Sequence, residues 1–208
     1  MRSLLRKSKP LTDPIVWVDC EMTGLDVNND HIIEICCIIT DGDLNVVDEN
    51  AYESTVYYLK DRLAQMDEWC TTTHTASGLI DKILENEDRS LEVVKNELLG
   101  YIKKYVTAPR KAVLAGNSIH MDRYFMMKEM PEVIDWLHYR NIDVSTIMEF
   151  GSRHNPELMK LCPKKKQAHT AKDDILESID QLKWYRKYYF KSGDDTAELV
   201  KAMKKGDI

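Results

Sequence analysis

The stretch IVWVDCEMTGLD, residues 15–26, places an apolar run directly before two acidic residues that are one position apart from each other. The apolar run predicts a buried strand over Ile15–Val18. Side chains two positions apart on a strand point to the same face, so Asp19 and Glu21 should project together from the strand end. Two neighbouring carboxylates repel each other and raise at least one pKa, whereas a divalent cation turns the repulsion into coordination. Two unpaired acids in a solvated turn are the alternative interpretation of this pair.

The remaining pattern predicts a run of strands followed by strands that alternate with helices. Apolar or alternating segments predict further strands at His31–Thr40, at Tyr52–Leu59, at Lys111–Asn117 and at Asn141–Thr146, with a hairpin turn at DGDL leading into Asn45–Asp48. Helical spacing, caps and breakers predict helices at Lys60–Trp69, at Ser90–Val106, at Met121–Met130, up to Arg153, at Pro156–Leu161 and from Thr170 to Phe190. We expect an α/β fold in which a mixed five-stranded sheet is flanked by helices, and a ribonuclease H-like architecture is one such arrangement.

Length and composition predict one folded domain. The 208 residues, of which 43% are hydrophobic and 31% charged, suffice for a single core of ordinary globular composition. We expect a basic N-terminal tail over residues 1–13, one domain over 14–192, and a polar C-terminal tail over 193–208 that is frayed or weakly helical. The basic opening predicts either a disordered tail or the remnant of an organelle transit peptide. An intracellular location, mitochondrial or cytoplasmic, is therefore expected.

Charge and cysteine content exclude several classes of protein. The net charge of -6 argues against a protein that grips long duplex DNA through many phosphate contacts. A short nucleic acid held by metal cations or by a local basic patch stays possible. The five cysteines form no C-x-x-C pair, which argues against a disulfide framework or a zinc site and favours a reducing compartment. No apolar run approaches the roughly 18 residues of a membrane span, so no membrane association is expected.

Two further segments carry residues suited to chemistry. Asp122 follows a predicted strand in AGNSIHMDRYF, and AHTAKDD places His169 before a helix whose first turn carries Asp173 and Asp174. Each of these residues also has an ordinary interpretation. Asp122 can be a helix-start acid favoured by the dipole, His169 a loop residue, and Asp173 the capping-box partner of Thr170.

Taken in order, these residues resemble the DEDDh exonucleases, which carry Asp-x-Glu on the first strand, a middle Asp, and His-x4-Asp before the last helix. The segments DCEMTGLD, DHIIEI, MDEWC, THTASGL, AGNSIHMDR, HYRNIDVST and HTAKDDILES are similar to the oligoribonuclease branch of that family, over roughly residues 14–190. One acid pair is a weak signal, but an ordered series of segments is specific. The chain departs at Thr170, where many members of the branch carry Arg, which puts a local phosphate contact in doubt.

The resemblance implies that Asp19, Glu21, Asp122 and Asp174 hold two Mg²⁺ or Mn²⁺ ions and that His169 is the general base. Two divalent ions roughly 3.5–4 Å apart stabilise both the attacking and the leaving oxygen of an in-line displacement. A histidine with an unperturbed pKa of roughly 6.5 can accept a proton from the attacking water at neutral pH. The implied reaction is 3′-to-5′ hydrolysis of short single-stranded RNA, down to dinucleotides, to nucleoside 5′-monophosphates.

The resemblance also implies substrate-binding residues. Leu25 would wedge against a base, and Trp69 and His74 would line the nucleotide pocket. The residues implied to hold the 5′ phosphate are Ser118, Arg140 and Ser145, with Tyr139 reaching it from the partner subunit of a two-fold homodimer. The alternatives are that Leu25 and Trp69 are packing residues, that the serines are strand-end or cap residues, and that Arg140 pairs with Asp143 or Glu132.

Two other functions and one interface stay open. The chain is alternatively a DEDDh exonuclease that acts on DNA or on longer RNA 3′ ends, or a non-catalytic nucleic-acid-binding relative. The non-catalytic alternative is disfavoured because all five candidate residues are present. Trp136, Leu137 and Tyr139 are candidates for a dimer interface, and equally for packing inside the monomer.

Overall fold

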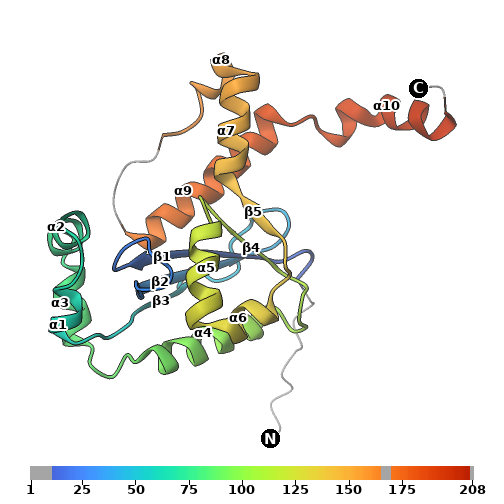
Figure 1. Cartoon of the computed structure of the whole chain (residues 1–208). Helices are drawn as coiled ribbons and strands as arrows, with labels where there is room; N and C mark the ends of the chain where they lie inside the picture. The colour runs from blue at the N-terminus through green and yellow to red at the C-terminus, as the bar shows by residue number, and fades with distance from the viewer. Residues whose placement is uncertain (1–10, 165–169, 207–208) are drawn as a thin grey trace, which may run out of the picture.

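The residues described by the computed structural model, 11–164 and 170–206, contain one mixed sheet with the strand order β3-β2-β1-β4-β5 (Figure 1). Its strands are β1 Ile15–Met22, β2 Ile32–Thr40, β3 Tyr52–Thr55, β4 Val113–Gly116 and β5 Asn141–Asp143. β1 pairs antiparallel with β2, and β2 with β3. On its other side β1 pairs parallel with β4, which pairs parallel with β5. The predicted mixed five-stranded sheet is confirmed, and the strand that carries the two acids is its central strand.

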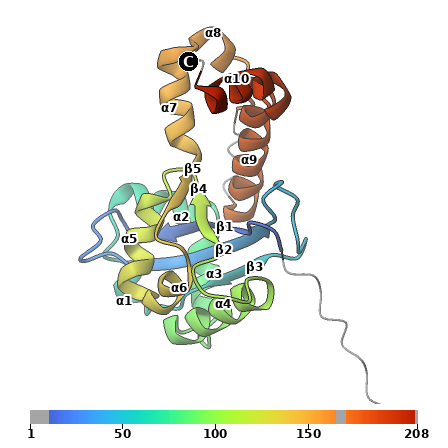
Figure 2. The ribbon, with the colours of Figure 1, turned by 90° about the vertical axis from the view of Figure 1, so that its right-hand side faces the viewer.

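Helices cover both faces of this sheet. Their bounds are α1 Lys60–Leu63, α2 Glu68–Ala76, α3 Leu79–Glu85, α4 Leu91–Tyr105, α5 His120–Glu129, α6 Pro131–Trp136, α7 Val144–His154, α8 Pro156–Met159, α9 Ala171–Trp184 and α10 Gly193–Lys205. α4, α5 and α6 pack on one face, and α9 lies across the other (Figure 1). α7 and α9 rise side by side from the sheet (Figure 2). The face under α9 is the one on which the candidate site lies.

The side chains of β1 alternate between the two faces. Val16, Val18 and Cys20 are buried under α4, α5 and α6, whereas Ile15 and Trp17 are buried in the cluster that contains α9. The next residues of the second series are the two acids, at positions 19 and 21. The apolar run alone predicted a strand that ends at Val18, before the acids. β1 continues to residue 22, so both acids lie within the strand. The expectation that both acids share one face is confirmed by this alternation.

The segment after β3 differs most from the prediction. The expected helix Lys60–Trp69 is wrong, because α1 ends at Leu63 and a new helix begins after Asp67, whose side chain accepts a hydrogen bond from the N–H of Cys70. α2 was not predicted, because the stretch TTTHTASG lacks an apolar stripe at helical spacing. α3 was not predicted either, and its 7 residues are too few for a helical period to stand out. β3 is shorter than the predicted strand Tyr52–Leu59.

The C-terminal part is more ordered than its composition suggests. The last predicted helix, α9, continues as a π-helical segment, Tyr185–Tyr189. α10 follows, and it begins with a capping box between Ser192 and Asp195, although the segment was predicted to be frayed or weakly helical. α10 buries no side chain and extends away from the sheet (Figure 1). Within the described ranges, no helix is long and apolar enough to cross a membrane.

Candidate active site

The carboxylate of Asp122 is fixed to the edge of β1. β4 pairs only with Ile15–Trp17, so the edge of β1 beyond that point is open to another partner. α5 starts just after β4, and Oδ1 of Asp122 accepts a hydrogen bond of 2.9 Å from the backbone N–H of Cys20. Because Cys20 lies between Asp19 and Glu21 in the strand, this bond brings the third predicted acid beside the first two. Asp122 is only 6% exposed.

The surroundings of Glu21 and Asp122 favour the protonated forms of both side chains. Burial raises the pKa of Asp122 to about 7, although the hydrogen bond from Cys20 opposes this rise. Burial also raises the pKa of Glu21 to about 7. Three neighbouring acids add to that rise through their negative charge, namely Glu34, Asp174 and Asp122. Acids from β1, β2, α5 and α9 thus act on one another electrostatically.

α9 brings the fourth predicted acid to the same place. Its N-cap is Thr170, whose Oγ1 accepts a hydrogen bond of 3.2 Å from the N–H of Asp173 and donates one of 2.6 Å to Oδ2 of Asp173. Asp173 is therefore the capping partner, and Asp174 acts electrostatically on Glu21. His169 lies outside the described residues, so its role as the general base stays a prediction.

The donor set fits a hard divalent cation. Carboxylate oxygens are the ligands that Mg²⁺ and Mn²⁺ prefer, and a bound cation would replace the repulsion around Glu21 with attraction. Within residues 11–164 and 170–206, however, no three His, Cys, Asp or Glu side chains lie in an arrangement that could already hold a metal ion. The assignment of Asp19, Glu21, Asp122 and Asp174 as metal ligands therefore stays a prediction.

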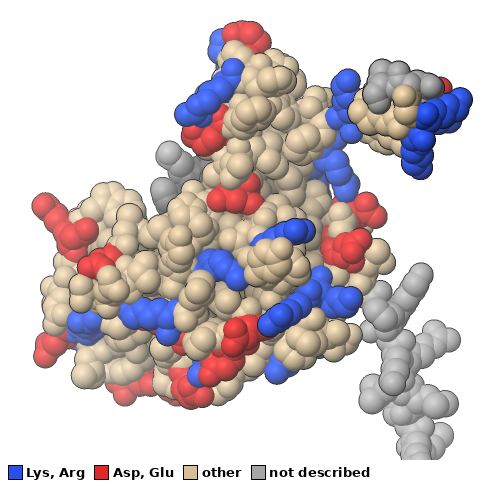
Figure 3. Space-filling model, turned by 45° about the vertical axis from the view of Figure 1, so that its right-hand side comes forward, with Lys and Arg blue, Asp and Glu red and all other residues tan. Residues whose placement is uncertain are grey.

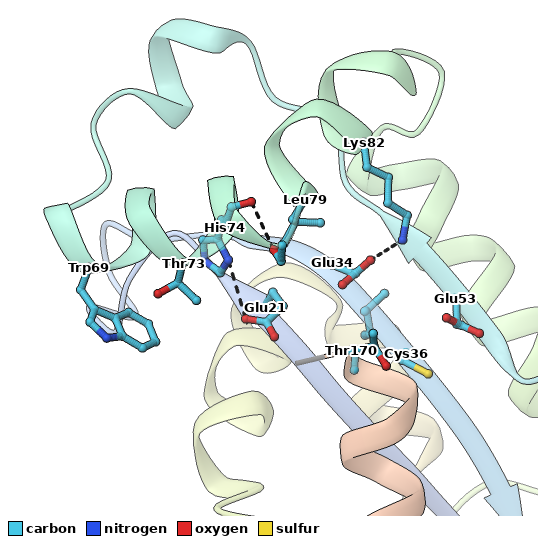
Figure 4. Close-up of a pocket in the computed structure, with 13 residues that line it drawn as sticks. Glu21, Glu34, Cys36, Glu53, Trp69, Thr73, His74, Leu79, Lys82 and Thr170 are labelled. Carbon is cyan, nitrogen blue, oxygen red and sulfur yellow. Dashed lines mark hydrogen bonds and ion pairs between the residues drawn. The ribbon is translucent and has the colours of Figure 1, made fainter. Parts of the chain in front are cut away.

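A cavity of about 540 Å³ opens beside Glu21, toward β2 and β3 (Figure 4). It lies between the sheet, helices α2 and α3, and the start of α9. The charged and aromatic side chains that line it are Glu21, Glu34, Glu53, Trp69, His74 and Lys82. The volume is within the roughly 300–1,000 Å³ of small-molecule pockets, so the cavity can hold a nucleoside.

Two of the residues predicted to contact the bases line this cavity. His74 is 2% exposed; its Nε2 donates to the carbonyl oxygen of Met22 at 3.0 Å, and its Nδ1 lies 4.0 Å from Oε2 of Glu21. Trp69 is 70% exposed, so it is not a core residue. Leu25 is also exposed and lies between β1 and β2, but it does not line the cavity.

Ser118 and Ser145 meet on the other side of β1, at the ends of β4 and β5. The N–H of Ser118 donates to Oγ of Ser145 at 2.9 Å and to Oδ1 of Asp143 at 3.0 Å, and the two serine hydroxyl oxygens are 3.3 Å apart. Ser118 has a left-handed backbone with φ 52°, which is strained for a residue with a side chain. Two of the three predicted phosphate-binding residues are thus held together by a fixed network, in which Ser145 also donates to Asn117.

The third predicted phosphate-binding residue, Arg140, lies apart from this network. Its guanidinium is 5.4 Å from the ring of Tyr139, and among the described residues it forms no hydrogen bond to either serine. The alternative that Arg140 pairs with Asp143 or Glu132 is wrong, because its side chain forms no ion pair within the described ranges.

The candidate interface residues differ in their exposure to solvent. Leu137 is 3% exposed, and the indole N–H of Trp136 donates to the carbonyl of Val106 at 3.0 Å, so both pack inside the monomer. Tyr139 is 71% exposed and stays available to a second subunit.

Glu34, a second acid that lines the cavity, was not among the predicted site residues. Glu34 lies opposite Glu21 in the β1–β2 register, and its Oε1 is 2.5 Å from Nζ of Lys82 (Figure 4). The alternation within DHIIEI places Glu34 on one face of β2 with Cys36. Which residue of β1 it faces depends on the register between the strands, which the sequence does not state.

Comparison with known proteins identifies the family of this chain. A family model described as exonuclease matches residues 16–182. The mitochondrial oligoribonuclease of Saccharomyces cerevisiae is 52% identical over 192 residues, which cover 89% of this chain and 71% of that protein. The oligoribonuclease of Acinetobacter baylyi is 44% identical over 177 residues, which cover 85% of this chain and 94% of that protein.

Solved structures show the same fold at much lower identity. Exonuclease I of E. coli, solved with a dT13 oligonucleotide, has a TM-score of 0.61 and 16% identity, covering 91% of this chain. This chain spans only 43% of that protein, so the likeness concerns the fold alone. The chain belongs to the exonuclease family and, within it, to the oligoribonucleases.

Proposed function

We propose that this chain is a 3′-to-5′ exoribonuclease that hydrolyses short oligoribonucleotides, down to dinucleotides, to nucleoside 5′-monophosphates. The observation that carries the proposal is the meeting of acids from β1, α5 and α9 at one place. A nucleoside-sized cavity lies on one side of these acids and the serine network of β4 and β5 on the other. Family membership and the names of the relatives support both the reaction and the RNA substrate.

The acids Asp19, Glu21, Asp122 and Asp174 would hold two divalent ions, Mg²⁺ or Mn²⁺. When bound, such ions stabilise charge on the attacking and leaving oxygens of a phosphodiester. The chain itself supplies the positions of the ligands, since the bond from Cys20 fixes Asp122 against β1. His169 would accept the proton of the attacking water.

The residues around the acids would hold the substrate. Trp69 and His74 would contact the nucleoside in the cavity, and Leu25 would separate it from the preceding base. Those that would hold the 5′ phosphate are Ser118, Arg140 and Ser145, together with Tyr139 from the partner subunit of a homodimer. The exposure of Tyr139 supports the last assignment.

The net charge of -6, together with the pattern of charge on one face, supports a short substrate. On the face drawn in Figure 3, Lys and Arg are interspersed with Asp and Glu and form no continuous basic stripe. A long nucleic acid is usually held by many phosphate contacts, which need such a stripe. We infer an intracellular location, in mitochondria or cytoplasm, because the S. cerevisiae relative is named a mitochondrial protein.

Timed digestion of RNAs of about 2, 5 and 20 nucleotides with Mg²⁺, with and without a chelator, tests the proposal. We expect the dinucleotide to be cleaved fastest and the chelator to stop all cleavage. Faster digestion of the longest RNA, or of DNA, would favour an exonuclease of broader substrate. Binding without any cleavage would favour the non-catalytic alternative.

A further inference from the structure

The cavity beside Glu21 has an acidic wall. Its carboxylates come from Glu21, Glu34 and Glu53. Among the described residues, two lysines beside these acids are paired, Lys82 with Glu34 and Lys172 with Glu53 at 3.4 Å. A phosphate group placed there would be repelled by these carboxylates. Sugar hydroxyl groups, in contrast, can donate charge-assisted hydrogen bonds to carboxylate oxygens. The cavity therefore suits the uncharged, hydroxyl-bearing end of a nucleic acid strand.

This charge distribution sets the direction of the substrate on the sheet. The serine network at the ends of β4 and β5 holds two hydroxyl groups, which must rotate out of their bonds within the network to donate to an anion. The cavity over β2 and β3 instead holds carboxylates, which accept hydrogen bonds from hydroxyl groups. A short RNA thus fits with its 5′ phosphate near Ser118 and Ser145 and its 3′-terminal nucleoside in the cavity. The scissile phosphate then lies between them, at the acids of β1.

Glu34 is placed to contact the terminal sugar. It faces Glu21 directly across the two strands, so the two carboxylates lie side by side on the face under α9. Lys82 binds Oε1 of Glu34, whose side chain is 15% exposed. Among residues 11–164 and 170–206, Oε2 of Glu34 makes no hydrogen bond and stays available as an acceptor. Two vicinal hydroxyl groups of a ribose match two adjacent carboxylates.

We propose that Glu34, held by Lys82, accepts a hydrogen bond from the 2′-hydroxyl of the 3′-terminal ribose and thereby makes the site prefer RNA ends to DNA ends. The 2′-hydroxyl is the group that DNA lacks. A site built to bind a substrate hydroxyl disfavours an analogue without it, because the acceptor of the site loses its partner. This assignment rests on the proposed function, since it requires the 3′-terminal nucleoside to occupy the cavity.

The test compares three dinucleotides that differ only in the 3′-terminal sugar: ribose, 2′-deoxyribose and 3′-deoxyribose. We expect Glu34→Met to lower kcat/KM about tenfold for the ribose substrate and less than about threefold for the 2′-deoxy substrate. The preference for ribose over 2′-deoxyribose should then nearly disappear, while the response to 3′-deoxyribose stays that of the wild type. Lys82→Met should shift the same ratio in the same direction, because it removes the group that orients Glu34.

The matched control is Glu132→Met, which removes another lysine-paired glutamate on the opposite face, whose Oε1 is 3.1 Å from Lys95. It should keep the wild-type ratio, and thermal unfolding should show that each variant is folded. Equal losses on all three substrates would show that Glu34 acts only through Glu21, and would overturn the inference. A wild-type protein that cleaves none of the three overturns the proposed function itself, whereas an active wild type with an unchanged ratio in Glu34→Met overturns only this inference.

Discussion

Asp122 and Glu21 are acids whose charged forms are disfavoured in the metal-free protein. Burial raises the pKa of each to about 7, whereas a carboxyl group in an unfolded chain has a pKa of roughly 4. Between these two values the folded state keeps protons that the unfolded state has released. The contribution of these two groups to the free energy of unfolding therefore falls as the pH rises through this interval.

We expect the metal-free wild-type protein to lose thermal stability, relative to the Asp122→Asn variant, as the pH rises from about 4 to about 7. Asp122→Asn should weaken this dependence, because the amide oxygen can still accept the bond from Cys20 but the side chain no longer ionises. Melting temperatures measured in chelator across this range check the prediction. An unchanged pH dependence in the variant would contradict it.

The sequence predicts the positions of some site residues but not of others. The shared face of Asp19 and Glu21 follows from two adjacent positions of one strand, so local alternation predicts it correctly. The position of Glu34 beside Glu21 depends on the pairing of two strands, and a shift of one residue would turn Glu34 to the other face. The pairing of Lys82 with Glu34 depends in turn on α3, which the sequence pattern did not predict.

At the scale of elements, the close approach of β4 to β1 depends on Gly116. A Cβ atom on this glycine would lie 2.9 Å from the carbonyl oxygen of Val18, closer than a carbon atom can approach. The same junction ends the β1–β4 pairing and opens the strand edge that Asp122 occupies. A residue without a side chain is thus required at the point where the β1–β4 pairing ends, next to the candidate site.

We expect Gly116→Ala to destabilise the protein by about 1–3 kcal/mol and to lower activity, because β4 must move away from β1. The matched control is Gly100→Ala in α4, where the added Cβ would meet nothing within 4 Å. That change should instead stabilise the protein by about 0.5–1 kcal/mol, since Ala is the better helix former. Urea unfolding of both variants measures the difference, and a loss of stability in Gly100→Ala would contradict the argument.

Elements with a strong apolar period were predicted well, and the others were not. α4 begins at its predicted cap, Ser90, and buries a regular stripe of apolar residues. α2 is mostly polar and is held by its cap at Asp67 and by the burial of only Cys70 and His74. Tertiary contacts determine such a helix, so local periodicity carries little information about it.

At the scale of the whole molecule, the proposed dimer makes each site depend on two chains. Tyr139 lies on the surface after α6, and within its own chain it contacts His138 and Arg140. If Tyr139 serves the partner subunit, a change of Tyr139 in one chain damages the site of its partner. A change of the acids or of His169 in that chain damages its own site instead. Two damaged chains can then combine into one intact site.

We expect co-expressed Tyr139→Ala and His169→Ala chains to recover activity that neither variant shows alone. His169→Ala should by itself lose roughly 10²–10⁴-fold in rate. Random pairing would give about a quarter of the wild-type activity, because about half of the dimers carry both chains and each of these has one intact site. Absence of recovery in purified mixed dimers would show that Tyr139 acts within its own chain.

The central position of β1 also determines when the enzyme becomes active during its own synthesis. β1 and β2 leave the ribosome first and can pair at once, but β4 and α9, which complete the surroundings of β1, are translated much later. A nascent chain consequently holds its first acids without their partners. In the proposed mechanism the growing chain therefore cannot attack RNA near the ribosome until α9 has been made, and the order of the elements delays nuclease activity without any separate inhibitor.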